Sequence, residues 1–239
     1  MKSKRNLWAL PILVAFAIAT FAVVDISDRD TMQPAGETRP STPAGGEIGT
    51  VTLAQLAEAL PTIGPHESIP EYRRDSFGTR WSDVDGNGCD QRQDVLSRDL
   101  VEVTYEGCTV LTGMLRDPYT GNTIEFQHDR VARAGNPGSQ GVQIDHIISL
   151  AAAHEGGAWQ WSPQDRELFA NQLTNLLAVD GKTNQSKSDR GPAAWMPPDP
   201  SYWCEYAAQY TQIATDWNLA VTSNDRDMLV DILKACTTS

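Results

Sequence analysis

The chain has 239 residues, of which 40% are hydrophobic and 21% are charged, a composition typical of a globular protein with a hydrophobic core. Nineteen Lys and Arg stand against 31 Asp and Glu, which gives a net charge of −12. This sign excludes proteins that hold nucleic acid mainly through a basic surface, and the 7 Trp, 6 Tyr and 5 Phe, which need burial, exclude disorder over most of the chain.

The N-terminal segment has the pattern of an export signal. Three basic residues precede an uncharged apolar run at residues 7–24. The run also reaches the lower limit for a membrane span, so residues 1–24 are either a signal peptide or an N-terminal membrane anchor. Both alternatives place the rest of the chain outside the cell or at its surface. Residues 25–49, rich in Pro, Gly, Thr and Ser, predict a flexible linker, and residues 50–239 predict the folded domain.

The folded part is predicted to be α+β. Thr50 is placed to cap the first helix, and alternating β-branched residues separated by turn signals predict a small antiparallel meander. In chain order, the expected elements are a helix at 51–60, strands at 101–105, 109–112 and 123–126, a strand at 142–148, helices at 149–155 and 162–170, a strand at 175–179, a short polar helix after it, and helices at about 202–217 and 224–235.

Four cysteines, Cys89, Cys108, Cys204 and Cys236, predict two disulfides, because an even number in an exported chain is typical of a disulfide framework. None lies in a Cys-x-x-Cys pair, which argues against a zinc site. Of the three connectivities we favour Cys89–Cys108 and Cys204–Cys236, because each closes a local loop and the second would join two C-terminal helices. Free buried thiols are the alternative.

An acidic loop at residues 83–94 fits the template of a calcium-binding loop. Asp83, Asp85 and Asn87 present side-chain oxygens at alternate positions, and Asp94 takes the final position, where the template has the longer Glu. The alternative is a loop of Asx turns held by a disulfide. Structural Ca²⁺ is therefore a prediction of the sequence, with this alternative left open.

The segment that points most clearly to chemistry is Asp145-His146, because a carboxylate and an imidazole are costly to bury among apolar β-branched residues. Downstream, Asn175 opens an apolar strand, while Asn184 and Lys187 are three residues apart and share a helix face. Carboxylate and amide oxygens suit Mg²⁺, an imidazole can deprotonate water, and a Lys can offset phosphate charge.

This order of residues resembles the HNH nuclease motif, also called the ββα-metal or His-Me finger. The nine-residue step from Asn175 to Asn184 is similar to that of the HNH domain of CRISPR effector nucleases. Over residues 70–236 the chain most resembles an exported actinobacterial HNH endonuclease family related to the C-terminal domain of GmrSD-type restriction enzymes. The stretches that carry this resemblance are Tyr-Arg-Arg-Asp-Ser-Phe-Gly at 72–78, Asn-Gly-Cys-Asp at 87–90, Asp-Pro-Tyr-Thr-Gly at 117–121 and Phe-Ala-Asn at 169–171.

The resemblance implies a role for each matching residue. His146 would be the general base, Asp145 and Asn184 would ligate the metal, Asn175 would hold the His146 imidazole, and Lys187 would contact phosphate or support the charged transition state. Many members have His where this chain has Asn184, and the difference favours Mg²⁺ or Mn²⁺ over Zn²⁺. The implied fold is a ββα-metal (HNH) core with an added antiparallel β meander and C-terminal helices, and the implied products carry 5′-phosphate ends.

The function predicted from the sequence is a secreted or surface-anchored, divalent-metal-dependent HNH endonuclease that hydrolyses phosphodiester bonds, with DNA as the expected substrate. Two alternatives stay open: RNA as the substrate, and a non-catalytic, calcium-stabilised cell-surface binding module. Within the family match, Asp90 or Arg92 is a further candidate for the edge of the nuclease cleft. Because a metal supplies positive charge locally, the net charge argues against tight binding of DNA and not against its cleavage.

Overall fold

The computed structural model describes residues 52–64 and 69–237, which belong to one compact unit. The predicted signal or anchor at 1–24 and the predicted linker at 25–49 lie outside the described residues. Within the described part, no helix has both the length and the apolar character needed to cross a membrane.

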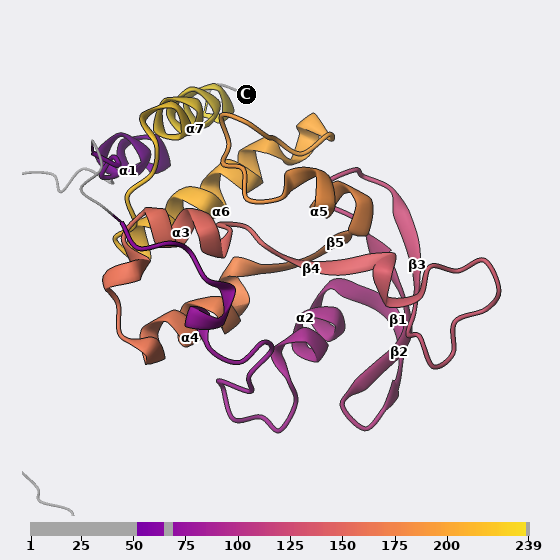
Figure 1. Cartoon of the computed structure of the whole chain (residues 1–239). Helices are drawn as coiled ribbons and strands as arrows, with labels where there is room; N and C mark the ends of the chain where they lie inside the picture. The colour runs from indigo at the N-terminus through magenta and orange to yellow at the C-terminus, as the bar shows by residue number, and fades with distance from the viewer. Residues whose placement is uncertain (1–51, 65–68, 238–239) are drawn as a thin grey trace, which may run out of the picture. The chain divides into compact units, whose positions relative to one another are not determined.

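The described chain combines helices with short antiparallel strands, in agreement with the predicted α+β class (Figure 1). In chain order the elements are α1 (Leu53–Ala59), α2 (Gln91–Asp99), β1 (Leu100–Glu106), β2 (Thr109–Arg116), β3 (Thr123–Gln127), β4 (Val142–His146), α3 (Leu150–Glu155), α4 (Pro163–Asn171), β5 (Leu176–Asp180), α5 (Gly181–Lys187), α6 (Trp203–Asp216) and α7 (Ser223–Cys236), with short 3₁₀ turns between some of them.

The strands form two separate sheets. β1, β2 and β3 make an antiparallel meander, as predicted, and β4 pairs with β5 in an antiparallel ladder that sets His146 opposite Leu176. Helix α5 begins directly after β5 and is capped by Asp180. A Cβ at Gly181 would collide with the carbonyl oxygen of Gln140, which explains glycine at this junction. Two paired strands followed at once by a helix therefore lie at the centre of the fold (Figure 1).

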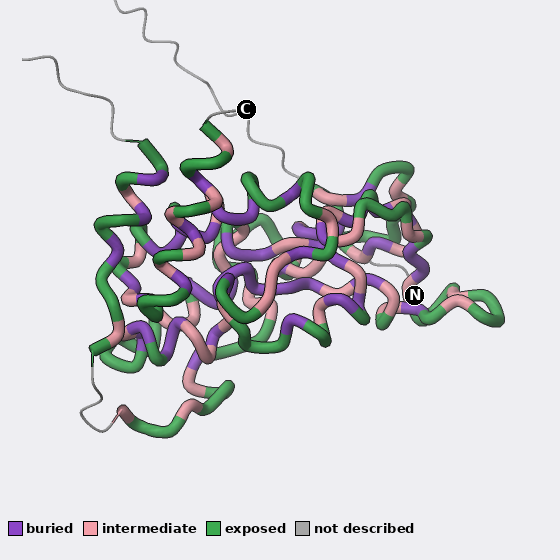
Figure 2. Tube along the Cα trace, turned by 90° about the horizontal axis from the view of Figure 1, so that it is seen from above, coloured by how far each residue is buried: buried purple, intermediate pink, exposed green. Residues whose placement is uncertain are grey.

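Two hydrophobic clusters hold the β4–β5 pair between them. The first packs α1, α3, α4, α6 and α7 together, and the second packs α2 with the β1–β3 sheet. Because side chains alternate along a strand, β5 directs Val179 into the first cluster and Ala178 into the second. Figure 2 shows buried segments running through the interior, while helices α1 and α7 alternate between buried and exposed residues. This double packing fixes the orientation of the residues on β4.

Two element predictions need correction, and one helix was not predicted. The first helix is capped by Thr52 and not by Thr50, because Thr52 and Gln55 form a capping box. The strand predicted to reach residue 148 ends at His146, since the next two backbone N–H groups donate to Asn175. Helix α2 was missed, although Asp90 caps it by accepting a hydrogen bond from the amide of Gln93 at 3.0 Å.

The structure confirms the favoured disulfides. Cys89 is bonded to Cys108 and Cys204 to Cys236, and the described chain contains no free cysteine. The second disulfide joins the first turn of α6 to the last turn of α7, as predicted.

Replacing both Cys204 and Cys236 with Ser is expected to lower the free energy of unfolding by about 2–4 kcal/mol. The cross-link spans 32 residues, and its removal gives the unfolded chain the conformational freedom of that loop. Equilibrium unfolding in urea under non-reducing conditions measures the change. A variant as stable as the wild-type protein would contradict this expectation.

Candidate functional site

A cavity of about 730 Å³ lies at strand β4, on the side where α3, α5 and the 72–92 segment meet. Asp145, His146 and Asn184 all line it, together with Gln143, Ser149 and Asp189. The structure thus brings together the predicted general base and both predicted metal ligands. Asn175 and Lys187 do not line the cavity, and their contacts differ from those expected.

His146 ends strand β4 with its side chain 9% exposed. Its Nε2 lies 2.7 Å from the carbonyl oxygen of Ala170, and since a carbonyl can only accept, Nε2 carries the proton and Nδ1 keeps its lone pair. Ala170 lies in the last turn of α4, where carbonyl groups lack helical partners. Burial lowers the pKa of His146 to about 3, so the imidazole is neutral near pH 7.

In the metal-free protein, His146 is expected to stay neutral at pH 5, with its proton on Nε2. Because its folded pKa of about 3 lies below its unfolded value of about 6.5, the unfolded chain takes up the proton first. The contribution of His146 to stability is therefore complete above about pH 6.5 and is lost as the pH falls towards 3. Long-range ¹H–¹⁵N NMR spectra of the imidazole report both the charge and the tautomer. An imidazolium pattern at pH 5 would contradict the burial argument.

Asp145 is held by a buried ion pair with Lys187, whose side chain is 0% exposed. The Lys187 Nζ lies 2.9 Å from Oδ2 and 3.1 Å from Oδ1 of Asp145, and it also donates to the His146 carbonyl at 2.8 Å. The Tyr119 hydroxyl donates to Oδ2 at 2.7 Å. Burial raises the pKa of Asp145, while the Lys187 ammonium and the Tyr119 hydroxyl oppose that rise and favour the ionised carboxylate.

These contacts correct the role expected for Lys187. Its ammonium group is bound to the Asp145 carboxylate and to the His146 carbonyl. It therefore does not reach the cavity where a phosphate would bind. Lys187 thus holds the end of β4 from the side away from the cavity.

The expected role of Asn175 also needs correction. Its side chain accepts from the Ile148 amide at 2.9 Å and donates to the Ile148 carbonyl at 3.2 Å, and its own carbonyl accepts from Ile147 at 2.9 Å. Asn175 therefore fixes the backbone that follows His146, and it is Ala170 that holds the imidazole.

The donor atoms at the cavity fit a hydrated Mg²⁺ or Mn²⁺ ion. Lys187 and Tyr119 make three contacts with the Asp145 carboxylate, two on Oδ2 and one on Oδ1, so Oδ1 is the less occupied of its two oxygens. Asn184 uses its amide nitrogen, which donates to Gln143 at 3.0 Å, and its carbonyl oxygen makes no hydrogen bond to the described residues. Two protein oxygens suit Mg²⁺, which usually keeps several waters. Within residues 52–64 and 69–237, no group of three or more His, Cys, Asp or Glu could form a closed metal cage.

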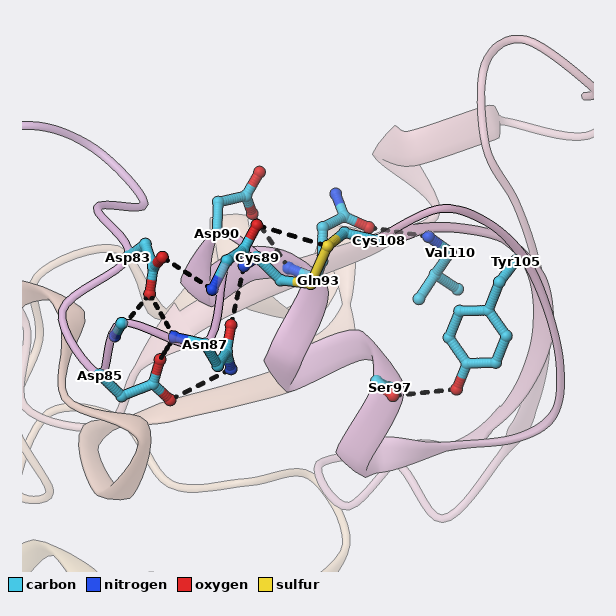
Figure 3. The surroundings of a disulfide bond; sticks show 12 residues. Asp83, Asp85, Asn87, Cys89, Asp90, Gln93, Ser97, Tyr105, Cys108 and Val110 are labelled. Carbon is cyan, nitrogen blue, oxygen red and sulfur yellow. Dashed lines mark hydrogen bonds between the residues drawn. A yellow bond between two sulfur atoms is a disulfide. The ribbon is translucent and has the colours of Figure 1, made fainter. Parts of the chain in front are cut away.

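In the acidic loop at residues 83–90, the Asp side chains accept hydrogen bonds from backbone amides of the loop itself (Figure 3). Asp83 accepts three amide hydrogen bonds from the loop, at 2.8, 3.1 and 2.9 Å, and Asp85 accepts one from Asn87 at 3.2 Å. Asp94 lies on α2 with its Oδ2 buried and without a hydrogen-bond partner, and burial raises the pKa of its carboxyl. The loop thus has the Asx-turn geometry of the alternative reading, and Ca²⁺ binding stays a prediction.

Four residues at or behind the cavity were missed as site residues: Arg74, Arg80, Trp81 and Tyr119. Arg74 and Tyr119 lie in the stretches that carry the family resemblance, which was the available signal. Of the two candidates for the edge of the cleft, Arg92 lines the cavity and Asp90 caps α2.

Comparison with known proteins gave two matches. The family model for the C-terminal domain of GmrSD restriction endonucleases matches residues 90–232, which include His146, Asp145 and Asn184. An uncharacterized secreted protein of Arthroderma benhamiae (strain ATCC MYA-4681 / CBS 112371) is 34% identical over 197 residues, which cover 81% of this chain and 90% of that protein. No solved structure matches the chain. The relative is fungal, so the expected link to actinobacteria is not supported, whereas its description as secreted agrees with the predicted export.

Proposed function

Because the chain belongs to the family of GmrSD restriction endonuclease C-terminal domains, we propose that it is an exported, divalent-metal-dependent HNH endonuclease that hydrolyses phosphodiester bonds of DNA. Strands β4 and β5 and helix α5 would form its ββα-metal core. The observation that carries the proposal is the position of the His146 imidazole, which lines the cavity beside Asp145 and Asn184 with its Nε2 held 2.7 Å from the Ala170 carbonyl oxygen.

In this proposal His146 is the general base. The hydrogen bond to Ala170 leaves Nδ1 as the basic nitrogen, and a water molecule in the cavity can give its proton to that atom as it attacks phosphorus. Burial makes the resting imidazole a weak base, with a pKa of about 3. A phosphate bound beside the ring would favour the imidazolium and raise this pKa during the reaction.

Asp145 and Asn184 would hold Mg²⁺ or Mn²⁺ through Oδ1 of Asp145 and the side-chain carbonyl of Asn184. When bound there, the ion would offset the negative charge on the phosphate and on the departing 3′ oxygen. Lys187 and Tyr119 orient the Asp145 carboxylate from the protein side. The expected products carry 5′-phosphate and 3′-hydroxyl ends.

Incubation of the purified protein with supercoiled plasmid tests the proposal. Nicked and linear DNA with 5′-phosphate ends is expected in MgCl₂ or MnCl₂, and excess EDTA is expected to stop the reaction. Labelling of the ends with polynucleotide kinase, before and after phosphatase treatment, identifies the end groups. Intact plasmid in the presence of every divalent ion tried would overturn the proposal.

A further inference from the structure

Three arginines line the cavity without a carboxylate partner. The guanidinium groups of Arg74, Arg80 and Arg92 make no hydrogen bond or ion pair with the described residues. Elsewhere in the described chain, Arg73 pairs with Asp75 at 2.7 Å and Arg130 with Glu106 at 2.6 Å. Arg116 and Arg133 also lack an ion pair with the described residues, but neither lines this cavity. The fold has therefore kept three positive charges free at one cavity.

These charges act on the site that contains His146. Arg74 and Arg80 line the same cavity as His146, and Arg80 directly precedes Trp81, whose ring stacks on the His146 imidazole. Arg92 is half-buried, and Asp90 and Asp129 are the carboxylates whose charges act on it. The carboxylates that line the same cavity are Asp145 and Asp189. Asp145 is already paired with Lys187, and Asp189 forms no ion pair with an arginine of the cavity, so the three guanidinium groups can bind an anion from outside.

The segment that carries Arg80 is held rigidly against α4. Glu167 on α4 accepts hydrogen bonds from the Thr79 amide at 3.1 Å and from the Ser82 hydroxyl at 2.5 Å, and Asn171 donates to the Thr79 carbonyl at 3.2 Å. The same helix supplies the Ala170 carbonyl that orients His146. One helix thus positions the general base and Arg80 relative to each other.

Trp81 reinforces this arrangement. Its backbone has φ of +59°, a conformation that is unfavourable for a bulky side chain and persists only where the surroundings impose it. Its ring stacks on the His146 imidazole, with centroids 6.2 Å apart and an angle of 10° between the planes. Trp81 lines the cavity, so the strained turn at residues 80–81 presents both a cation and an aromatic face to the site.

We propose that Arg74, Arg80 and Arg92 form a phosphate-binding rim that holds the nucleic-acid backbone on either side of the bond to be cleaved. The inference rests on the proposed function, and it adds how the substrate is held. Arginine binds phosphate with two parallel hydrogen bonds, and contacts to the backbone carry no sequence information. The rim therefore predicts binding that is independent of base sequence and strongly dependent on salt, in a protein whose net charge is negative.

Binding of a fluorescein-labelled DNA duplex, measured by anisotropy in EDTA so that no cleavage occurs, tests the rim. For each rim contact removed by Arg74→Gln, Arg80→Gln or Arg92→Gln, the slope of log K against log salt concentration is expected to fall by about 0.9. Arg226→Gln is the matched control, because it removes the same charge from α7, where Arg226 lies 3.6 Å from Asp227 and outside the cavity. An RNA duplex of the same sequence is measured in parallel.

The half-buried position of Arg92 calls for a second variant. Arg92→Lys keeps the charge and is expected to keep the slope of the wild-type protein, whereas Arg92→Gln loses it. A lower slope of log K against log salt concentration in the three Gln variants, with either duplex, supports the rim. The duplex that shows it identifies the nucleic acid that the rim holds. Slopes equal to that of Arg226→Gln with both duplexes overturn it. Plasmid cleavage by the wild-type protein is measured separately, so failure of the rim leaves the nuclease proposal standing, and absence of cleavage overturns the nuclease whatever the slopes.

Discussion

Replacing His146 with alanine is expected to slow DNA cleavage by about 10²–10⁴-fold, the usual cost of removing a general base. The residue ends β4, its Nε2 is fixed by the Ala170 carbonyl, and its Nδ1 is the nitrogen able to take the proton of water. Single-turnover cleavage with excess protein in Mg²⁺ measures this step without a contribution from product release. Because the ring is held by one hydrogen bond to a backbone carbonyl, its loss removes the base without breaking a side-chain network.

His128→Ala is the control for this experiment. His128 follows β3, accepts a hydrogen bond from the Arg130 amide at 3.2 Å and does not line the cavity, so its removal is expected to leave the rate unchanged. A folded His146→Ala protein that cleaves DNA as fast as His128→Ala would show that His146 is not the base.

Replacing Lys187 with methionine is expected to lower the free energy of unfolding by about 3–5 kcal/mol, because it leaves the Asp145 carboxylate buried without its cation. Asp145 is 5% exposed, so water cannot replace the ammonium. Urea unfolding at neutral pH measures the loss. In the double variant Lys187→Met/Asp145→Asn part of the stability is expected to return, because the buried charge has also been removed.

Lys182→Met is the matched control for the ion pair. Lys182 lies on the same helix, α5, but is exposed, so this change is expected to alter stability by less than about 0.5 kcal/mol. If Lys187→Met and Lys182→Met were equally stable, the buried pair would not hold β4 and α5 together.

The residue pattern was sufficient to bring Asp145, His146 and Asn184 to one site, because each lies in an element whose type is clear from the sequence. It could not predict the hydrogen-bond partner of His146, because that partner is the backbone carbonyl of Ala170 and any residue type has such a carbonyl. Periodicity also put Asn184 and Lys187 on one helix face. The burial of Lys187 depends on how α5 packs against β4, which periodicity does not specify.

Helix α2 was missed for a related reason. Asp94 was assigned to the last position of a calcium loop, and in the structure it lies inside a helix that Asp90 caps. The calcium template and helix α2 use the same polar residues, and the packing of Val95 and Leu96 into the second hydrophobic cluster, which stabilises the helix, is not evident from those residues.

The net charge of the chain is a poor guide to the charge at the cavity. A net charge of −12 is a sum over the whole chain, whereas the fold gathers three unpaired arginines at the cavity that contains His146. The exclusion drawn from composition therefore applies to the protein as a whole and does not describe this cavity. Local charge, set by the meeting of the 72–92 segment with β4 and α5, is what a phosphate would encounter.

Conversion of supercoiled plasmid by the wild-type protein and by His146→Ala, each in MgCl₂ and in EDTA, is the most direct test of the proposed nuclease site. Rapid cleavage is expected in one of the four reactions, that of the wild-type protein in MgCl₂. Equal cleavage by the folded His146→Ala protein, or cleavage by the wild-type protein that continues in EDTA, would contradict a metal-dependent site built on His146.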